Sequence, residues 1–269
     1  QARLRVASRK AMKKADALVP VSRCMSRHLA HTGMETRKLH LIENWPDPEL
    51  AGHGYEWLSE GLDGMTGKKP RRDIKGKEPQ HKDHHDAKFR VLYAGTIGRT
   101  NPMETILSAA QILQSRHPEI EFVFVGKGPG YERLAASRAK HGLENIRILP
   151  PQPRFKLKAL MESGDIHLVS LSDAATGLTM PSKLYSALAV ARPVAFIGAQ
   201  DCHVAGLINK HHCGAVIPHS QPQKLAAMIR NYRMDSSKWF AAHEGAIAAA
   251  ENRMPEVSLK HWVKLIGSV

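Results

Sequence analysis

Three consecutive residues, Pro181, Ser182 and Lys183, have the side chains needed to hold an anion. Proline suits the first position of a helix and serine can cap one, so the sequence predicts that a helix begins here. A helix N-terminus has free N–H groups and the positive end of the helix dipole, and Lys183 adds a full positive charge in the first turn. We interpret this point as a candidate phosphate site. A core helix with a solvated lysine is the alternative interpretation.

The residues that follow predict how this site is positioned. Leu184, Leu188 and Ala191 recur at helical spacing, so they form an apolar stripe that faces a sheet. Arg192 and Pro193 end the helix, because proline cannot continue one. Residues 194–197 are wholly apolar and predict a short buried strand.

The same alternation of strand and helix extends over most of the chain. Strands are predicted at residues 90–95, 120–125, 145–149, 165–170, 194–197 and 214–217, with helices between them, one opened by Pro102, one from about 130 to 141 and one over 155–162. This order predicts an α/β fold, a Rossmann-like parallel sheet with helices on both faces. Ligands of such sheets bind beyond the carboxyl ends of the strands, which indicates the loops at residues 95–101, 126–130, 150–154 and 172–182.

The first 48 residues predict part of a second Rossmann-like domain. A basic helix over residues 1–15 precedes strands at 17–21 and 39–42, with a helix between them that Ser22 caps and Gly33 ends. Because the sequence starts in a helical pattern, we expect the chain to begin inside a domain. We divide the chain into this remnant (1–48), a basic flexible linker (49–88), a ligand-binding domain (89–250) and a C-terminal helix (251–269).

Charge and composition limit the class of partner. The 269 residues have a formal net charge of +14, which favours anionic partners such as nucleotides, phospholipid head groups or nucleic acid. Nucleic acid has only the charge in its favour, because aromatic residues are 6% and no binding motif places them among the basic residues. Three scattered cysteines indicate a reducing compartment, and no apolar run approaches the roughly 18 residues of a membrane span.

Three other motifs do not predict a redox cofactor, a nucleophile or a metal site. Gly126, Lys127 and Gly128 resemble half of a dinucleotide fingerprint, but its third glycine would fall at Tyr131, so NAD is not expected. The two glycines either bring backbone close to a ligand or only make a tight turn. Cys213, beside two histidines, is read as an ordinary loop residue and not as a nucleophile. The histidines of the linker, His81, His84 and His85, have no spacing that fixes a metal site, and no metal is expected.

Taken together, the motifs resemble the C-terminal, donor-binding half of a retaining GT-B glycosyltransferase of family 4. The resemblance rests on six motifs in order: ADALVPVS (15–22), IENW (42–45), YAGTIGR (93–99), VGKGP (125–129), PSKLY (181–185) and ARPV (191–194). It is strongest to members that build bacterial surface polysaccharides, such as N-acetylfucosamine transferases. The sequence departs from the family pattern at Thr96 and Asn101, where many relatives place an arginine and a lysine. It also departs at Leu178 and Ser186, where relatives carry two glutamates.

The resemblance implies transfer of a sugar from a UDP- or GDP-sugar, without a redox cofactor, to a glycan or lipid-linked acceptor. Such an enzyme is expected in the cytoplasm, at the inner face of the membrane, with peripheral membrane contact. It implies that backbone near Gly98 and the Ser182 helix holds the diphosphate, that Lys183 and Arg99 offset its charge, and that residues 151–154 lie near the base. The donor-binding residues implied are Gly98, Arg99, Gly126, Lys127, Gly128, Pro151, Arg154, Thr179, Pro181, Ser182, Lys183 and Ser186. No catalytic residue is assigned. A non-catalytic nucleotide-sugar-binding or regulatory module is the alternative function.

Overall fold

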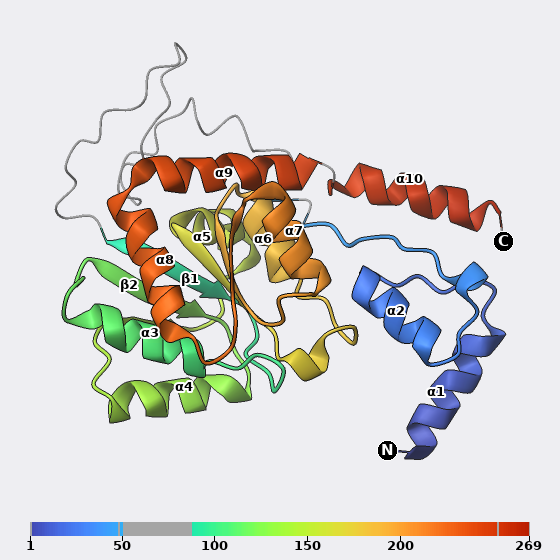
Figure 1. Cartoon of the computed structure of the whole chain (residues 1–269), viewed down its shortest axis with the longest axis horizontal. Coiled ribbons are helices and arrows are strands. Elements are labelled where there is room, and N and C mark those ends of the chain that lie inside the picture. Colours follow the sequence, from blue (N-terminus) through green and yellow to red (C-terminus); the bar gives the residue numbers. More distant parts are fainter. Residues whose placement is uncertain (1, 48, 51–87, 252, 269) are drawn as a thin grey trace, which may run out of the picture.

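A computed structural model describes residues 2–47, 49–50, 88–251 and 253–268 (Figure 1). Its centre is a six-stranded sheet in which every neighbouring pair is parallel, in the order β3-β2-β1-β4-β5-β6. The strands are β1 (Phe89–Ala94), β2 (Ile120–Val125), β3 (Ile146–Leu149), β4 (Ile166–Ser170), β5 (Val194–Ile197) and β6 (Gly214–Ile217). The Rossmann-like parallel sheet predicted from the sequence is confirmed.

The strand order reverses between β1 and β4, which lie side by side at the middle of the sheet. In open α/β sheets this switch point opens a crevice beyond the carboxyl ends of the two strands, and ligands bind there. The loops that follow β1 and β4 are residues 95–101 and 172–182. The topology therefore places the candidate phosphate site at the switch point.

Helices cover both faces of the sheet, because both faces of its strands are apolar. Val91 and Tyr93 of β1 belong to one core cluster, whereas Leu92 between them belongs to another on the opposite face. The helices of this domain are α3 (Glu104–Gln114), α4 (Pro129–Lys140), α5 (Leu157–Ser163), α6 (Lys183–Ala189), α7 (His203–His211), α8 (Pro222–Met234) and α9 (Ser236–Glu251). A last helix, α10 (Pro255–Ile266), extends from α9 towards the N-terminal segment (Figure 1).

Two helix starts differ from the sequence predictions. Helix α3 begins at Glu104, two residues after Pro102. The Pro102 carbonyl lies outside the helix and accepts a hydrogen bond from Ser170 Oγ at 2.6 Å. Helix α5 begins at Leu157, after a single 3₁₀ turn over Arg154–Lys156. Both shifts lie at the carboxyl edge of the sheet, where tertiary hydrogen bonds compete with the local helical pattern.

The N-terminal segment contains α1 (Ala2–Lys14) and α2 (Arg23–His31), and Ser22 caps α2 as predicted by accepting from the Met25 N–H at 3.1 Å. The two predicted strands are wrong as strands, because they meet in a single parallel bridge between Leu18 and Leu39. Pro20 is the physical reason. The next ladder bond would need an N–H from Pro20, which proline lacks.

The linker proposed over residues 49–88 lies almost wholly outside the described residues, as do its three histidines. Leu50 is described, and it is buried against Met161, Ala189 and Val190. In the described part of the chain, no helix is long and apolar enough to cross a membrane.

Candidate functional site

The loops at the carboxyl edge of the sheet contact one another as the topology predicts. Ile97 in the first loop donates its N–H to the Lys127 carbonyl at 3.2 Å and accepts from the Gly130 N–H at 3.1 Å. The Ser172 N–H donates to the Thr100 carbonyl at 2.9 Å, which joins the fourth loop to the first. The loop after β1 is thus the centre of the edge, held from both sides.

Among the contacts that the structure describes, Lys183 is the only charged side chain from outside this central loop that touches it. Its ammonium donates to the Thr96 carbonyl at 3.3 Å and lies 5.1 Å from the centre of the Tyr93 ring. Burial lowers the pKa of Lys183. A half-buried ammonium that has a carbonyl partner and, among the described residues, no carboxylate partner is suited to receive an anionic ligand.

The helix that carries Lys183 starts differently from the prediction. Ser182 occupies the N-cap position in helical backbone geometry, and its side chain makes no capping hydrogen bond. Pro181 lies before the cap and not at the first helical position. The first turn is instead closed by backbone, since Leu184 N–H donates to the Pro181 carbonyl at 3.2 Å and Tyr185 N–H to the Ser182 carbonyl at 3.0 Å. Ser182 is exposed, and its hydroxyl is not engaged in capping.

The paired glycines after β2 make a close backbone packing. Gly126 and Gly128 have φ of 151° and 122°, which L side chains rarely adopt. A Cβ on Gly128 would lie 2.7 Å from the Ile97 carbonyl oxygen, and one on Gly126 would collide with the Gly95 carbonyl oxygen. These glycines let the second loop lie directly against the first, which is the structural alternative weighed from the sequence.

Tyr131 explains why the dinucleotide fingerprint is broken. It stands where a third glycine would fall, and its hydroxyl donates to the Gly95 carbonyl at 3.0 Å. Tyr93 makes the matching contact from β1, donating to the Thr96 carbonyl at 2.9 Å. Burial raises the pKa of both tyrosines, so both hydroxyls stay protonated donors. Sequence reasoning did not find these roles, although the replaced glycine at Tyr131 was the available signal.

The other predicted residues lie at the same edge with unequal access to a ligand. The Gly98 N–H already donates to Asn101 Oδ1 at 3.1 Å. Arg99 and Lys127 are exposed on the rim, and so are Pro151 and Thr179. Ser186 is half-buried on α6.

Arg154 has partners that the sequence did not reveal. Its guanidinium makes ion pairs with Asp47 at 3.2 Å and with Glu49 at 2.9 Å. The two carboxylates raise the pKa of Arg154, with the Glu49 hydrogen bond as the largest cause. Arg154 thus connects the loop after β3 to the segment that enters the sheet domain.

A second polar contact joins the same entry segment to α10. Glu43 accepts from Arg253 at 2.8 Å and lies 3.5 Å from His203 Nε2, while Ser258 Oγ donates to the Glu43 carbonyl at 2.8 Å. Burial alone would raise the pKa of Glu43, but the hydrogen bonds and charges of His203 and Arg253 hold it below its usual value. The motif IENW is therefore a structural junction.

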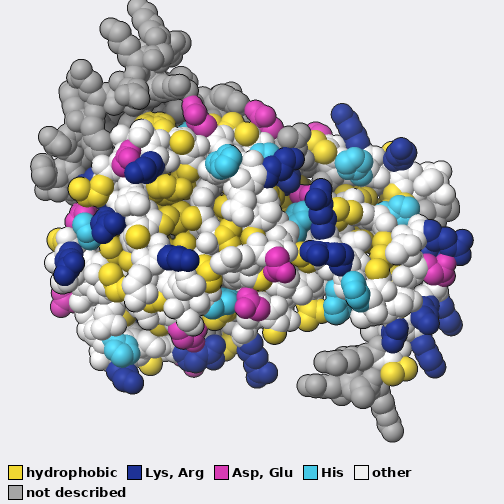
Figure 2. Space-filling view, in the orientation of Figure 1, with side chains coloured by type: hydrophobic (Ala, Val, Ile, Leu, Met, Phe, Trp, Pro, Cys, Tyr) yellow, Lys and Arg dark blue, Asp and Glu magenta, His cyan; other side chains and the backbone are white. Residues whose placement is uncertain are grey.

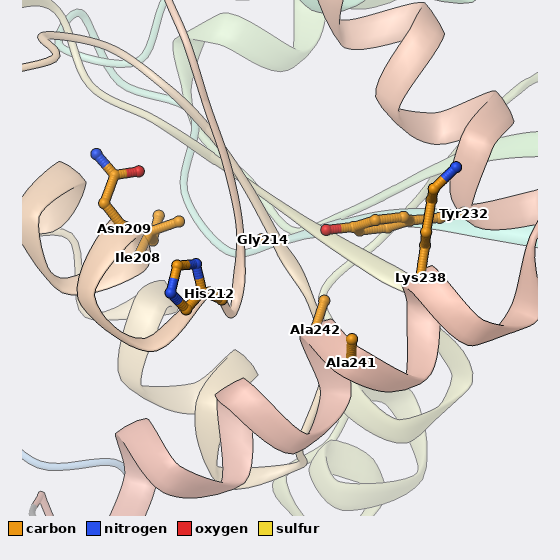
Figure 3. Close-up of a pocket in the computed structure, with 8 residues that line it drawn as sticks. All are labelled: Ile208, Asn209, His212, Gly214, Tyr232, Lys238, Ala241 and Ala242. Carbon is orange, nitrogen blue, oxygen red and sulfur yellow. The ribbon is translucent and has the colours of Figure 1, made fainter.

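A hollow of about 510 Å³ lies at the opposite edge of the sheet (Figure 3). Gly214, the first residue of β6, is part of its wall. Its lining is Ile208, Asn209, His212, Gly214, Tyr232, Lys238, Ala241 and Ala242, and it includes none of the predicted donor-binding residues. Cys213 is buried, and burial raises its pKa to about 11, so it is a protonated thiol and not a nucleophile. Among the described residues no cluster of three or more His, Cys, Asp or Glu could hold a metal ion.

Comparison with known proteins decides the family. The family described as glycosyl transferases group 1 matches residues 75–242, more than half of the chain. The chain belongs to this family. The match includes the whole carboxyl edge described above.

Curated relatives of the chain include two bacterial proteins. Over 108 residues it is 38% identical to WcaI of Escherichia coli (strain K12), which is described provisionally as a colanic acid biosynthesis glycosyl transferase. Over 141 residues it is 28% identical to WbjE of Pseudomonas aeruginosa, described provisionally as a glycosyltransferase. These matches cover 40% and 51% of this chain but only 26% and 34% of the relatives.

Solved structures show the same fold at low identity. The crystal structure of HepE from Anabaena in complex with UDP-glucose superposes with a TM-score of 0.74 at 17% identity, over 100% of this chain and 68% of HepE. WaaG, a glycosyltransferase involved in lipopolysaccharide biosynthesis, superposes with a TM-score of 0.68 at 18% identity, over 97% of this chain and 66% of WaaG. The GT-B architecture expected from the sequence is confirmed.

Proposed function

We propose that this glycosyltransferase takes a sugar from a UDP- or GDP-sugar and transfers it, with retention of anomeric configuration, to a glycan or lipid-linked acceptor in surface polysaccharide synthesis. The reaction takes place in the cytoplasm at the inner face of the membrane and uses no redox cofactor. The family match supports the reaction type, and the structures of HepE with UDP and UDP-glucose support the class of donor. The description of WcaI supports the role in polysaccharide synthesis.

The observation that carries the proposal is the position of Lys183. As the bond to the sugar breaks, the nucleoside diphosphate leaves with additional negative charge on its phosphate oxygens. A fixed cation that is partly removed from water stabilises that charge more than a solvated one does. Lys183 meets this requirement at the switch point of the sheet, with its ammonium against the Thr96 carbonyl. Arg99 and Lys127 on the rim add charge that attracts the donor.

The test is calorimetric titration of the chain with UDP, GDP and their sugars, together with Lys183→Met. We expect selective binding of one nucleotide and a loss of roughly 10- to 100-fold in affinity in the variant, the range for a charge-assisted hydrogen bond. Lys88→Met is the matched control, because Lys88 Nζ also donates to a backbone carbonyl, that of Pro118 at 2.8 Å, next to the start of β1. Binding of no nucleotide, or equal losses in both variants, contradicts the proposal.

A non-catalytic nucleotide-sugar-binding module is favoured by one observation. Leu178 and Ser186 stand where the resemblance places two glutamates of the family. The two functions differ in turnover. A donor-binding module binds the nucleotide and weakens with Lys183→Met, but it releases no sugar from the bound donor in the presence of acceptor lipids.

A further inference from the structure

The side chain of Lys183 is held by the loop after β1 before any ligand arrives. Figure 2 shows Lys and Arg side chains on the visible face, several of which extend from the surface into solvent. Lys183 is instead half-buried, and its ammonium donates to the Thr96 carbonyl at 3.3 Å. A solvated lysine samples many rotamers, and ordering it on a ligand lowers the affinity. A protein that already holds the side chain in place removes this cost.

Gly95 leaves the space in which the end of this side chain lies. A Cβ at this position would be 2.9 Å from Lys183 Cε and 3.3 Å from its Nζ, and the first distance is shorter than real Cβ contacts. Gly95 also has a φ of 122°, which glycine adopts readily. The end of the Lys183 side chain therefore packs directly against bare backbone.

The ring of Tyr93 lies beneath the ammonium. The Lys183 nitrogen is over this ring at 5.1 Å from its centre, inside the roughly 6 Å within which an aromatic face attracts a cation. Tyr93 is 0% exposed and packs against Phe124 of the neighbouring strand, with ring centres 5.9 Å apart. Because the ring is fixed in the core, it fixes the place where the ammonium is most stable.

The hydroxyl of Tyr93 acts on the same carbonyl as the lysine. It donates to the Thr96 carbonyl at 2.9 Å, so this oxygen accepts from both Tyr93 and Lys183. A carbonyl oxygen has two lone pairs and can accept both bonds. When an anion draws the ammonium away, the carbonyl keeps its bond from Tyr93 and is not left unpaired. Lys183 can thus exchange its carbonyl partner for a phosphate oxygen at low cost.

We propose that Tyr93 is a positioning residue for Lys183. Its ring holds the ammonium at the switch point of the sheet, and its hydroxyl keeps the Thr96 carbonyl paired when the ammonium turns to the ligand. The inference rests on the proposed function for the identity of that ligand, a nucleoside diphosphate. Tyr93 itself makes no contact with the ligand and acts only through Lys183.

The first measurement is an NMR spectrum of the whole chain without ligand. Protons over the face of an aromatic ring are shifted upfield, so the ε-methylene of Lys183 should be displaced from the ordinary lysine signals. Loss of this signal in Lys183→Met assigns it. Tyr93→Phe should keep the displacement, and Tyr93→Leu should remove it.

Phe124→Leu is the matched control for the leucine variant. It removes a second fully buried ring from the same core cluster, at the position that pairs with Tyr93 on β2. The displaced Lys183 signal should remain in this control. A signal that stays displaced in Tyr93→Leu, or that is lost equally in the control, overturns the proposal.

The second measurement is calorimetric titration of the same variants with UDP and GDP. We expect affinity to fall about two- to fivefold in Tyr93→Phe and about tenfold in Tyr93→Leu. It should stay within about twofold of wild type in Phe124→Leu, whose ring lies away from the ammonium. In the Lys183→Met background neither Tyr93 variant should lose more, because the two residues act as one unit.

A loss of equal size in the Lys183→Met background overturns the proposal, because Tyr93 then acts through the packing of the loop. Failure of the wild-type chain to bind either nucleotide contradicts the proposed function. The Lys183 signal, which is recorded without ligand, decides independently whether Tyr93 holds the lysine in place.

Discussion

The Lys183 ammonium and the Thr96 carbonyl lie 3.3 Å apart, and they join the helix after β4 to the loop after β1 across the switch point of the sheet. This contact gives the lysine one neutral partner in a place where burial lowers its pKa. A diphosphate that replaces the carbonyl as partner would favour the charged form and raise the pKa again. Binding of a diphosphate at this residue would therefore be coupled to proton uptake.

The first prediction is a loss of nucleotide affinity at high pH. Affinity is highest while Lys183 is charged in the free protein, and it falls as pH rises through the lowered pKa of the free state. Titrations with UDP and GDP from pH 7 upwards should show this fall, and buffers of different ionisation enthalpy should show proton uptake on binding. Lys183→Arg should remove the decline, because a guanidinium stays charged over this range. The same decline in the arginine variant would assign the titration to another group.

The second prediction concerns the Tyr131 hydroxyl. Tyr131→Phe removes the donor to the Gly95 carbonyl and leaves the first loop held at one point fewer. We expect the free energy of unfolding to fall by about 0.5–1.5 kcal/mol, which lowers the melting temperature by roughly 1–6 °C, and the affinity for the nucleotide to become weaker. Tyr232→Phe is a suitable comparison, since Tyr232 is at the opposite edge, in the wall of the hollow. It should leave nucleotide affinity unchanged. An unchanged affinity in Tyr131→Phe would show that the first loop keeps its position without this bond.

The third prediction compares two glycines. Gly128→Ala places a Cβ 2.7 Å from the Ile97 carbonyl oxygen in a backbone conformation with φ of 122°. Such strain costs about 1–3 kcal/mol and displaces the loop that carries Ile97. Gly206→Ala is the control. It lies within α7 with no atom within 4 Å of the added Cβ, so it should be neutral or stabilise by about 0.5–1 kcal/mol. Thermal melts of both variants provide the measurement, and equal effects would contradict the packing argument.

Most of the sheet could be predicted from the sequence because its strands are short apolar runs separated by amphipathic helices, a local signal. The failures have a different origin. Pro20 interrupts a predicted strand pair because it has no N–H to donate. This effect can be recognised only when the partner strand is known. The sequence could not show that Arg154 pairs with Asp47 and Glu49, 107 and 105 residues away, or that Glu43 pairs with Arg253, 210 residues away. Periodicity has no information on such contacts, so the sequence predicts Arg154 only as a donor-binding residue.

The candidate site shows the same division. Its location followed from the rule for parallel sheets, and Lys183 was found from its place after Pro181 and Ser182. The capping role of Ser182 was wrong, because backbone bonds from Leu184 and Tyr185 close the first turn without it. The hydroxyl contacts of Tyr93 and Tyr131 depend on loop carbonyls that only the folded chain brings within reach.

The last prediction concerns the junction at Glu43. Its folded pKa is held below the usual value, so the ion pair stabilises the fold above the unfolded-state pKa and is lost as pH falls through the folded value. Below about pH 4.5 the contact of the entry segment with Arg253 should therefore weaken progressively.

Limited proteolysis with an acid-active protease should cut near residues 39–47 faster as pH falls from 5 to 3. In Glu43→Gln the cutting should already be fast at pH 5 and should depend less on pH. The free energy of unfolding of this variant should be lower by about 1–2 kcal/mol. Glu35→Gln is the control, since its partner Arg37 is exposed and on the same turn. A wild-type cutting rate that is constant from pH 5 to 3 would show that Glu43 does not hold the entry segment in place.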